Sequence, residues 1–215
     1  MSSNVSSFFD RYAHDFNAIY GNSNGPMDAV VNRLFRRSMA LRYQKTLEGC
    51  DPIEGKSVLD IGSGPGHYSV ALAQRGASEV LGLDFADGML EVARKRAADA
   101  GVQDVCRFEK GDFLEREFDR KFDYAIIMGF MDYIADPAPM IRKTLSLTRR
   151  RAFFSFPVKG GLLGWQREMR YRSRCDLYMY TEDSVRKLFD GIEGARARIE
   201  KIDRDLFVTV EMLAQ

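Results

Sequence analysis

The sequence predicts an α/β protein: a doubly wound, mostly parallel seven-stranded sheet with an antiparallel last strand, preceded by N-terminal helices. Three observations predict it. From Lys56 onward, short apolar segments alternate with amphipathic ones, which is typical of strands joined by helical crossovers. The first strand runs into a glycine-rich turn at residues 62–66. Only a tight turn at residues 203–205 separates the last two apolar segments, which predicts a terminal hairpin.

Two helices are expected before the first strand. Aromatic and aliphatic residues spaced three and four apart predict an amphipathic helix up to about Tyr20, and residues 21–26 form a turn-rich break. Asp28 is placed to cap a second helix, which the Asp51–Pro52 pair ends. The aromatic stripe of the first helix fits either the core or the underside of a lid, so both roles stay open.

The elements of the sheet follow in order. Predicted strands cover about 57–61, 79–84, 105–109, 122–128, 151–157, 195–202 and 206–212. Predicted helices cover about 66–75, 87–100, 137–147 and 181–189, with Gly101 as a stop signal and Thr181 with Ser184 as a capping start. In such a sheet, ligands bind beyond the carboxyl ends of the strands, where the strand order reverses.

Composition limits the class of protein. At 215 residues the chain is long enough for one domain with a substantial core, and its formal net charge of +1 gives no overall attraction to nucleic acid or an anionic membrane. No apolar run approaches the roughly 20 residues of a membrane-spanning helix, and the N-terminus lacks a signal-peptide pattern. The widely spaced Cys50, Cys106 and Cys175 favour reduced thiols in a cytoplasmic protein. Neither they nor His14 and His67 predict a metal site.

Residues 58–70 predict a buried strand, a tight turn and the start of a helix. The glycines follow the pattern G-x-G-x-G at Gly62, Gly64 and Gly66, whereas a turn built for a pyrophosphate has G-x-G-x-x-G. Asp60, two residues earlier, would repel a pyrophosphate but would accept hydrogen bonds from an ammonium group or water. The pattern therefore favours a ligand with a cationic amino-acid end and no phosphate.

The same stretch resembles the first motif of class I S-adenosyl-L-methionine (SAM)-dependent methyltransferases, (V/L)LD-x-G-x-G-x-G. The resemblance covers about residues 56–157 and implies a Rossmann-like methyltransferase fold, SAM as the cofactor and S-adenosyl-L-homocysteine (SAH) as its product. Because N-terminal helices cover the cofactor in this family, residues 1–50 are expected to form a helical lid on a single domain, 1–215. In the glycine stretch, the cofactor-binding residues that the resemblance implies are Asp60, Gly62, Ser63, Gly64 and Gly66.

The ends of the second and third strands carry further candidates. Asp84 is placed to accept both ribose hydroxyls of a nucleoside, and the resemblance implies that role. Phe85 and Met89 are candidates to flank the adenine ring, although plain packing explains them equally well. The resemblance also implies that Asp112 accepts a hydrogen bond from the adenine amino group and that the Phe113 backbone N–H reaches the ring.

The fourth strand ends in Met128 and Gly129, where the resemblance implies that the methionine part of the cofactor meets the substrate. Asp132 and Tyr133 are the candidate catalytic residues, each able to accept or orient a substrate proton. Many family members carry His where this chain has Asp132, so the identity of a general base stays open, and Asp132 is also placed to cap the next helix. Methyl transfer depends mainly on aligning nucleophile and methyl carbon, so it does not require a base.

Residues 158–180 are expected to form an insertion over the active site. This connection mixes basic with aromatic side chains: Lys159, Arg167, Arg170, Arg172 and Arg174 with Trp165, Tyr171, Tyr178 and Tyr180. Such a loop suits a substrate cover, and its charges suit an acidic group such as a carboxylate or phosphate. A solvated basic helix is the alternative, and a nucleic-acid contact is disfavoured by the neutral overall charge.

Two further segments refine the expected function. Residues 8–21 and the strand end FSFPVK are similar to small-molecule O-methyltransferases, including magnesium-protoporphyrin carboxyl methyltransferases. Tyr12, Tyr20 and Arg42 are candidates to close over the carboxylate end of the cofactor. The sequence thus predicts a SAM-dependent methyltransferase of the cytoplasm that acts on a small molecule, with oxygen as the favoured acceptor atom. An NAD(P)-dependent oxidoreductase and a non-catalytic SAM-binding protein are the alternatives, and the oligomeric state stays open.

Overall fold

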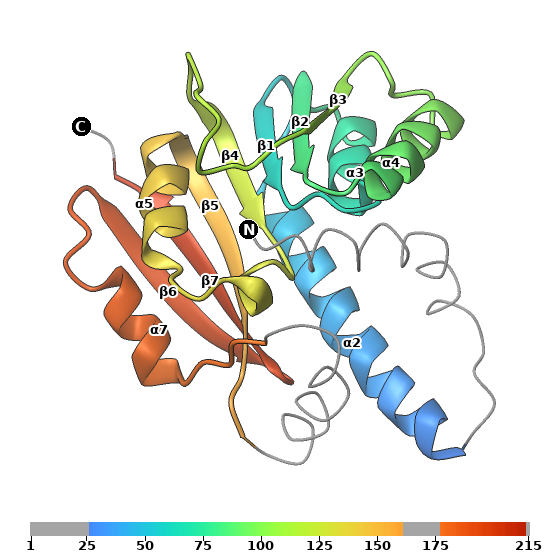
Figure 1. The fold of residues 1–215 in the computed structure, drawn as a ribbon. Coiled ribbons are helices and arrows are strands. Elements are labelled where there is room, and N and C mark those ends of the chain that lie inside the picture. The colour runs from blue at the N-terminus through green and yellow to red at the C-terminus, as the bar shows by residue number, and fades with distance from the viewer. Residues whose placement is uncertain (1–25, 161–176, 214–215) are drawn as a thin grey trace.

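The computed structural model describes residues 26–160 and 177–213, with side chains from residue 37 onward. Its sheet has the strand order β3-β2-β1-β4-β5-β7-β6 (Figure 1). The strands are β1 (Ser57–Ile61), β2 (Glu79–Asp84), β3 (Cys106–Lys110), β4 (Phe122–Ile127), β5 (Thr148–Pro157), β6 (Ala195–Ile202) and β7 (Asp205–Met212). The helices are α2 (Pro26–Gly49), α3 (His67–Gln74), α4 (Asp87–Asp99), α5 (Ala138–Ser146) and α7 (Glu182–Phe189), with a 3₁₀ turn η1 (Met131–Tyr133).

Strand directions confirm the predicted fold class. Strands β1 to β5 pair in parallel, whereas β7 runs antiparallel to both β5 and β6. From β1 the chain adds β2 and β3 on one side of the sheet and then β4 and β5 on the other. The strand order therefore reverses between β1 and β4, which is where a ligand is expected in a sheet of this kind.

Helices cover both faces of the sheet. On β1, Val58 is buried among residues of α3 and α4, and Leu59 is buried on the opposite face among residues of α5 and α7. This alternation follows from the two-residue period of a strand. Helix α2 shares the face of α3 and α4. Its last residue, Gly49, lies close to β5, because a Cβ there would be 2.5 Å from a ring carbon of Phe153.

The N-terminal helix starts two residues before the predicted cap. Helix α2 begins at Pro26 rather than at Asp28, because proline fits the first turn of a helix, where its missing N–H has no intrahelical role. It packs against α3, β5, β6 and β7, so this part of the expected 1–50 segment lies against the body of the protein. Residues 1–25, with the predicted first helix, lie outside the described residues.

The other predicted elements are present with small shifts at their ends. The predicted cap of α7 is confirmed: the Ser184 backbone N–H donates to Thr181 Oγ1 at 3.1 Å, and the Thr181 N–H donates to Ser184 Oγ at 2.9 Å. Strand β5 starts three residues earlier than predicted, because Thr148 pairs with Phe122 beyond a register shift in β4. The turn η1 was not predicted, and it begins four residues after the last residue of β4.

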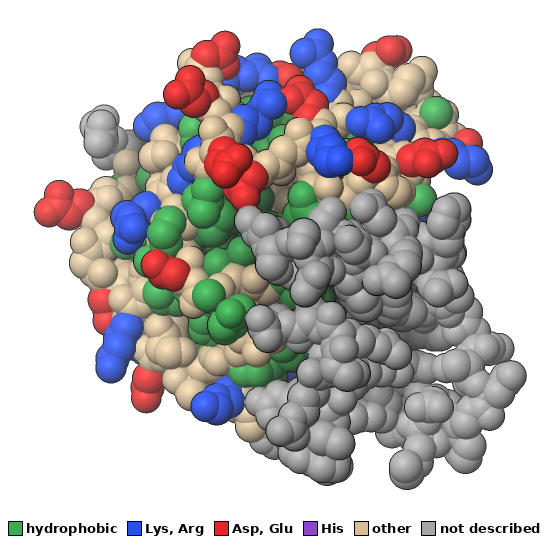
Figure 2. Space-filling model, viewed as in Figure 1, with side chains coloured by type: hydrophobic (Ala, Val, Ile, Leu, Met, Phe, Trp, Pro, Cys, Tyr) green, Lys and Arg blue, Asp and Glu red, His purple; other side chains and the backbone are tan. Residues whose placement is uncertain are grey.

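The surface in the view of Figure 2 is divided by residue type. Hydrophobic side chains gather in the middle of the described part of this face, and most charged side chains lie toward its edge. None of the helices between residues 26 and 213 that the structure describes could cross a membrane.

Burial raises the pKa of the Cys50 thiol and raises that of Cys106 to about 12, so both thiols stay protonated.

Candidate cofactor site

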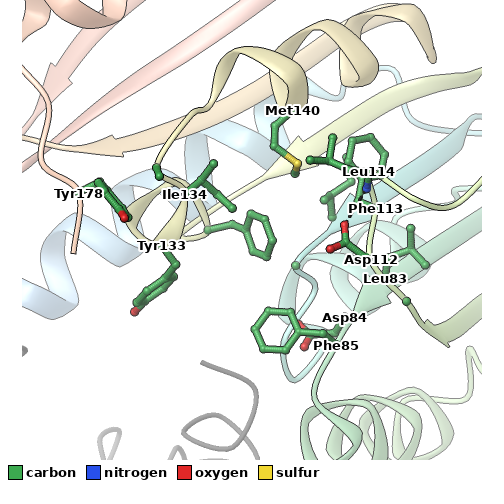
Figure 3. Close-up of a pocket in the computed structure, with 15 residues that line it drawn as sticks. Leu83, Asp84, Phe85, Asp112, Phe113, Leu114, Tyr133, Ile134, Met140 and Tyr178 are labelled. Carbon is green, nitrogen blue, oxygen red and sulfur yellow. Dashed lines mark hydrogen bonds between the residues drawn. The ribbon is translucent and has the colours of Figure 1, made fainter. Parts of the chain in front are cut away.

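A cavity of about 360 Å³ opens beyond the carboxyl ends of β1 to β4 (Figure 3). Its volume falls within the range of roughly 300–1,000 Å³ that is typical of small-molecule sites. The lining residues are Ile61, Gly62, Leu83, Asp84, Phe85, Gly111, Asp112, Phe113, Leu114, Phe130, Tyr133, Ile134, Ala135, Met140 and Tyr178. Among these lining residues the charged ones are two acids, Asp84 and Asp112, and no Lys, Arg or His is present.

The glycine turn forms one side of this site. Gly62, Gly64 and Gly66 have φ angles of 68°, 51° and 75°, in the left-handed region that favours glycine. A Cβ on Gly62 would be 2.4 Å from a ring carbon of Phe130, and one on Gly66 would be 3.0 Å from the Ala93 Cβ. Nothing lies within 4 Å of a Cβ on Gly64. Gly62 and Gly66 are therefore required by packing, whereas Gly64 faces open space.

Asp84 is tied to this turn. Its Oδ2 accepts a hydrogen bond from the Gly64 N–H at 2.8 Å, and its Oδ1 accepts one from the Ala86 N–H at 2.9 Å. The side chain is 7% exposed and lines the cavity at the end of β2. An ionised carboxylate only accepts hydrogen bonds, from N–H or O–H donors. Asp84 thus combines a fixed orientation with the chemistry needed to accept hydroxyl groups.

The two predicted adenine neighbours after β2 occupy different layers. Phe85 lines the cavity, and its ring is tilted against that of Phe130, with 6.4 Å between the centroids. Met89 is 2% exposed and packs with Ala86 behind Phe85, outside the set of lining residues. Phe85 therefore forms the wall of the cavity, and Met89 supports it.

The loop after β3 forms the opposite wall. Asp112 Oδ1 accepts a hydrogen bond from the Leu114 N–H at 2.9 Å, as the dashed line in Figure 3 shows. Lys143, on α5, donates its ammonium protons to the carbonyls of Leu114 at 2.8 Å and Arg116 at 2.5 Å. Phe113 is 4% exposed and lines the cavity. Asp112 and Phe113 are therefore brought together with Asp84, as the sequence predicts.

Asp60 and Ser63 are buried and are not among the residues that line the cavity. Asp60 is 2% exposed and accepts the Ser69 hydroxyl at 2.6 Å, so its carboxyl points toward α3. Burial, and then the charge of Asp84, raise the pKa of Asp60 to about 6, against the lowering effect of the Ser69 hydrogen bond. Ser63 is 6% exposed, and its backbone N–H donates to the Leu83 carbonyl at 3.0 Å. Both residues stabilise the turn from within.

The tip of β4 lies beside a buried arginine of α2. Gly129 has a φ of 71°, and its N–H donates to Ser155 Oγ at 2.8 Å. Arg42 Nη1 donates to the same hydroxyl at 3.1 Å and would lie 3.8 Å from a Cβ on Gly129. Met128 is half-buried and packs at the edge of the α3–α4 core. Arg42 thus brings a positive charge to the end of β4.

The two candidate catalytic residues of η1 point in different directions. Tyr133 lines the cavity, whereas Asp132 is 3% exposed and does not. Successive residues of a 3₁₀ turn diverge by about 120°, so one turn cannot aim both side chains at one cavity. Asp132 is near Tyr180: burial, and then the Asp132 charge, raise the pKa of Tyr180 to about 12.

The C-terminal end of the predicted insertion, residues 178–180, is hydrogen-bonded to η1 and the residue after it. The Tyr178 N–H donates to the Asp132 carbonyl at 2.8 Å, and the Tyr180 hydroxyl donates to the Ile134 carbonyl at 3.0 Å. Val158 and Tyr180 pair as an isolated parallel bridge, which closes the two stems of the segment against each other. Tyr178 then reaches the cavity (Figure 3). Both described stems therefore lie next to the candidate site.

Several lining residues were not predicted from the sequence. They are Ile61, Leu83, Gly111, Leu114, Phe130, Ile134, Ala135 and Met140. Phe130 is the one that the sequence could have indicated. It follows Gly129 just beyond the end of β4, where the ligand is expected, so a large apolar side chain there is a candidate to line the cavity. The predictions for Tyr12, Tyr20, Trp165, Tyr171 and the four arginines 167, 170, 172 and 174 lie outside the described residues.

Comparison with known proteins identifies this part of the chain. A methyltransferase-domain family model matches residues 53–157, from the turn before β1 to the end of β5. This segment is a methyltransferase domain. The methyltransferase domain supplies strands β1 to β5 and every lining residue of the cavity except Tyr178.

Curated relatives match the same part of the chain. The methyltransferase domain is similar to the ubiquinone biosynthesis O-methyltransferase of Neisseria meningitidis, with 36% identity over 107 residues, covering 48% of this chain and 44% of that protein. The Pseudomonas aeruginosa protein of the same name is 39% identical over 90 residues, covering 42% of this chain and 38% of its own length. The chain thus spans less than half the length of the curated relatives it matches.

Solved structures match nearly the whole chain. Magnesium protoporphyrin IX methyltransferase from Synechocystis with bound SAH superposes with a TM-score of 0.76 at 22% identity, over 97% of this chain and 98% of that one. The DhpI–SAH complex gives 0.71 at 15% identity, over 99% and 97%. These likenesses show that the fold around the methyltransferase domain is the class I methyltransferase fold, as the glycine motif predicted.

Proposed function

We propose that this chain binds SAM and transfers its methyl group to a small molecule, at an oxygen atom. The observation that carries the proposal is the cavity beside the glycine turn, whose charged lining residues are Asp84 and Asp112. Among the described lining residues a pyrophosphate would face two carboxylates and no Lys, Arg or His, whereas a nucleoside without phosphate would find acceptors for its hydroxyl and amino groups. The similarity to curated relatives named as O-methyltransferases supports the same chemistry.

The residues present fit SAM as the ligand. Asp84 would accept the ribose hydroxyls, and Phe85 and Phe130 would flank the adenine ring in the cavity that they line. Asp112 and the Phe113 backbone would meet the edge of the ring. We assign Asp60, Ser63 and Met89 to the support of these groups, because all three are buried outside the lining.

The methionine end would lie at the tip of β4. Gly129 leaves room there because it has no side chain, and Arg42 presents a guanidinium, whose planar fork matches a carboxylate. The chemistry that SAM supplies when bound is an electrophilic methyl group on a sulfonium. The chain itself binds the cofactor and the methyl acceptor, orients them toward each other and excludes water. Such positioning accounts for most of the rate enhancement in an in-line displacement.

The acceptor is proposed to enter beside Tyr133. Of the two candidate catalytic residues, Tyr133 is the one whose side chain lines the cavity. Its hydroxyl is therefore better placed than Asp132 to accept or orient a proton of the methyl acceptor. The backbone carbonyl of Asp132 would instead help to position the segment that carries Tyr178, because it accepts the Tyr178 N–H. We also propose that the methyl acceptor carries an acidic group, which the basic side chains of residues 159–174 support. The proposal further includes a lid formed by residues 1–50, a cover formed by residues 158–180 and a cytoplasmic location.

The test is transfer of label. The purified chain is incubated with SAM labelled in its methyl group and with a low-molecular-mass cell extract, and label is followed into small molecules by chromatography. The proposal expects protein-dependent label in at least one compound, lost on addition of SAH and reduced in Asp84→Asn. A chain that binds SAH but labels nothing in extracts from several sources would instead support a non-catalytic SAM-binding protein.

A further inference from the structure

A buried charge pair joins α2 to the start of β7. Arg42 Nε lies 3.5 Å from Asp205 Oδ2, and the Arg42 and Asp205 side chains are 11% and 3% exposed. The Ser38 hydroxyl donates to the same carboxylate oxygen at 2.6 Å. Asp205 therefore has two neighbours from one face of α2, one charged and one polar, spaced one helical turn apart.

The same arginine also contacts β5, the strand that pairs with β7. Its Nη1 donates to Ser155 Oγ, on β5, and Ser155 accepts the Gly129 N–H. The guanidinium thus has an ion pair with Asp205 of β7 on its Nε side and a hydrogen bond from Nη1 to Ser155 of β5, beside the glycine at the tip of β4. Two fixed contacts on a planar group determine its orientation, which a flexible arginine on a helix surface would lack.

We propose that Asp205 is a positioning residue for the cofactor: it holds the Arg42 guanidinium at the tip of β4, where that group binds the methionine carboxylate of SAM. This inference rests on the proposed function. Asp205 itself does not line the cavity described above, and it acts through Arg42. A buried acid beside a buried arginine also offsets the desolvation of the charge, so that Arg42 stays in place before the cofactor arrives.

The turn before β7 contains a matched control. Asp203 lies two residues from Asp205 and pairs with Arg37 at 3.7 Å, but the Arg37 side chain is 69% exposed. Asp203 has a φ of 51°, a conformation that asparagine adopts readily, so Asp203→Asn preserves the turn. One acid lies in the turn and the other at the start of β7, and each pairs with an arginine of α2, yet of the two pairs only that of Asp205 is buried beside Gly129.

The experiment compares two ligands that differ in the group Arg42 would bind. SAH carries the amino-acid carboxylate, whereas 5′-methylthioadenosine has the same nucleoside and sulfur without it. Dissociation constants for both are measured by calorimetry in the wild type, Asp205→Asn, Ser38→Ala, Asp203→Asn and Arg42→Gln. Circular dichroism and thermal unfolding of each variant check that the fold is kept.

We expect Asp205→Asn to weaken SAH binding about tenfold and 5′-methylthioadenosine binding less than twofold, with Ser38→Ala showing the same selectivity to a smaller extent. Asp203→Asn should change neither affinity, and adding Asp205→Asn to Arg42→Gln should have no further effect on SAH. Equal weakening of both ligands would mark Asp205 as merely structural and overturn the inference, as would unchanged SAH binding in both Asp205→Asn and Ser38→Ala. Absence of SAH binding by the wild type would overturn the proposed function itself.

Discussion

The ring of Phe130 lies against the backbone of Gly62, so that a Cβ on Gly62 would be 2.4 Å from Phe130 Cδ2. This contact joins the turn after β1 to the tip of β4, the two strands between which the strand order reverses. It also places Phe130 opposite Phe85, at 6.4 Å between ring centroids. The wall of the cavity therefore depends on the absence of one side chain.

The two glycines of the turn should respond differently to alanine. Gly62→Ala adds a clash with Phe130 to the cost of a left-handed alanine, so we expect a loss of about 2–4 kcal/mol in the free energy of unfolding. Gly64→Ala carries only the backbone cost, about 1–2 kcal/mol, because nothing lies within 4 Å of the added Cβ. Urea denaturation measures both, and equal losses would contradict the packing role of Gly62.

Substitution of Phe85 should mainly lower the affinity for SAH, whereas substitution of Met89 should mainly lower the free energy of unfolding. We expect Phe85→Ala to weaken SAH binding about tenfold, because the ring forms the cavity wall. Met89→Ala should cost about 2–5 kcal/mol of stability through the cavity left in a buried site, with a smaller effect on SAH affinity. Calorimetry and urea denaturation of the two variants check this, and the reverse pattern would place Met89 rather than Phe85 against the cofactor.

Asp60 should make stability depend on pH. Its pKa is raised to about 6 from the 3.8 of a solvated side chain, so the folded state binds the proton more tightly than the unfolded state. The free energy of unfolding should therefore fall as the pH rises from about 4 to 6. At about 1.36 kcal/mol per pH unit, the difference between these pKa values corresponds to a loss of about 3 kcal/mol.

The control for this pH dependence is Asp60→Asn. Its amide oxygen can still accept the Ser69 hydroxyl, but the side chain no longer gains a charge in the interior. Urea denaturation at several pH values should show that the variant lacks the Asp60 part of the slope and equals or exceeds the wild type in stability above pH 6. A slope between pH 4 and 6 that is the same in both proteins would contradict the assignment.

Tyr180 should anchor the end of the 158–180 segment. Tyr180→Phe keeps the ring on Phe156, with 5.1 Å between centroids, but removes the hydrogen bonds to the Ile134 and Met131 carbonyls. We expect a loss of about 1 kcal/mol in stability and faster hydrogen exchange at the Tyr178 amide, which donates to Asp132.

Tyr124→Phe is the comparison for this change. It also removes a hydroxyl that donates to a backbone carbonyl, that of Pro52, at 3.3 Å, but Tyr124 packs on the α3–α4 face of the sheet, whereas Met131 of η1 packs on the other face. Exchange at the Tyr178 amide should stay as in the wild type in this variant. If both variants accelerate that amide equally, Tyr180 has no special part in holding the segment.

Most of the fold could be predicted because the bounds of most helices and strands depend on residues within the same segment. Short apolar runs predicted the bounds of β1 and β2, and the Thr181–Ser184 pair predicted the start of α7. The terminal hairpin, with its short turn, predicted that β7 runs antiparallel. The start of β5 was missed because its first residues include three arginines, which carry no apolar signal.

The candidate site was predicted in part, for a related reason. Strand-end residues such as Asp84 and Asp112 are fixed by topology, so their convergence follows from the parallel sheet. The direction of a side chain within a turn is not, and Asp132 and Tyr133 accordingly diverge. The pairing of Arg42 with Asp205 depends on how α2 packs across the sheet, which no local pattern in either segment encodes.

The central claim is that the cavity beside Asp84 binds the nucleoside of SAM, and calorimetry tests it most directly. SAH and NAD are titrated separately into the wild type and into Asp84→Asn, whose amide keeps an acceptor for the Gly64 N–H. We predict micromolar-range SAH binding, weaker by about tenfold or more in the variant, and much weaker NAD binding. Tighter binding of NAD than of SAH, or SAH binding that Asp84→Asn leaves unchanged, would contradict the account.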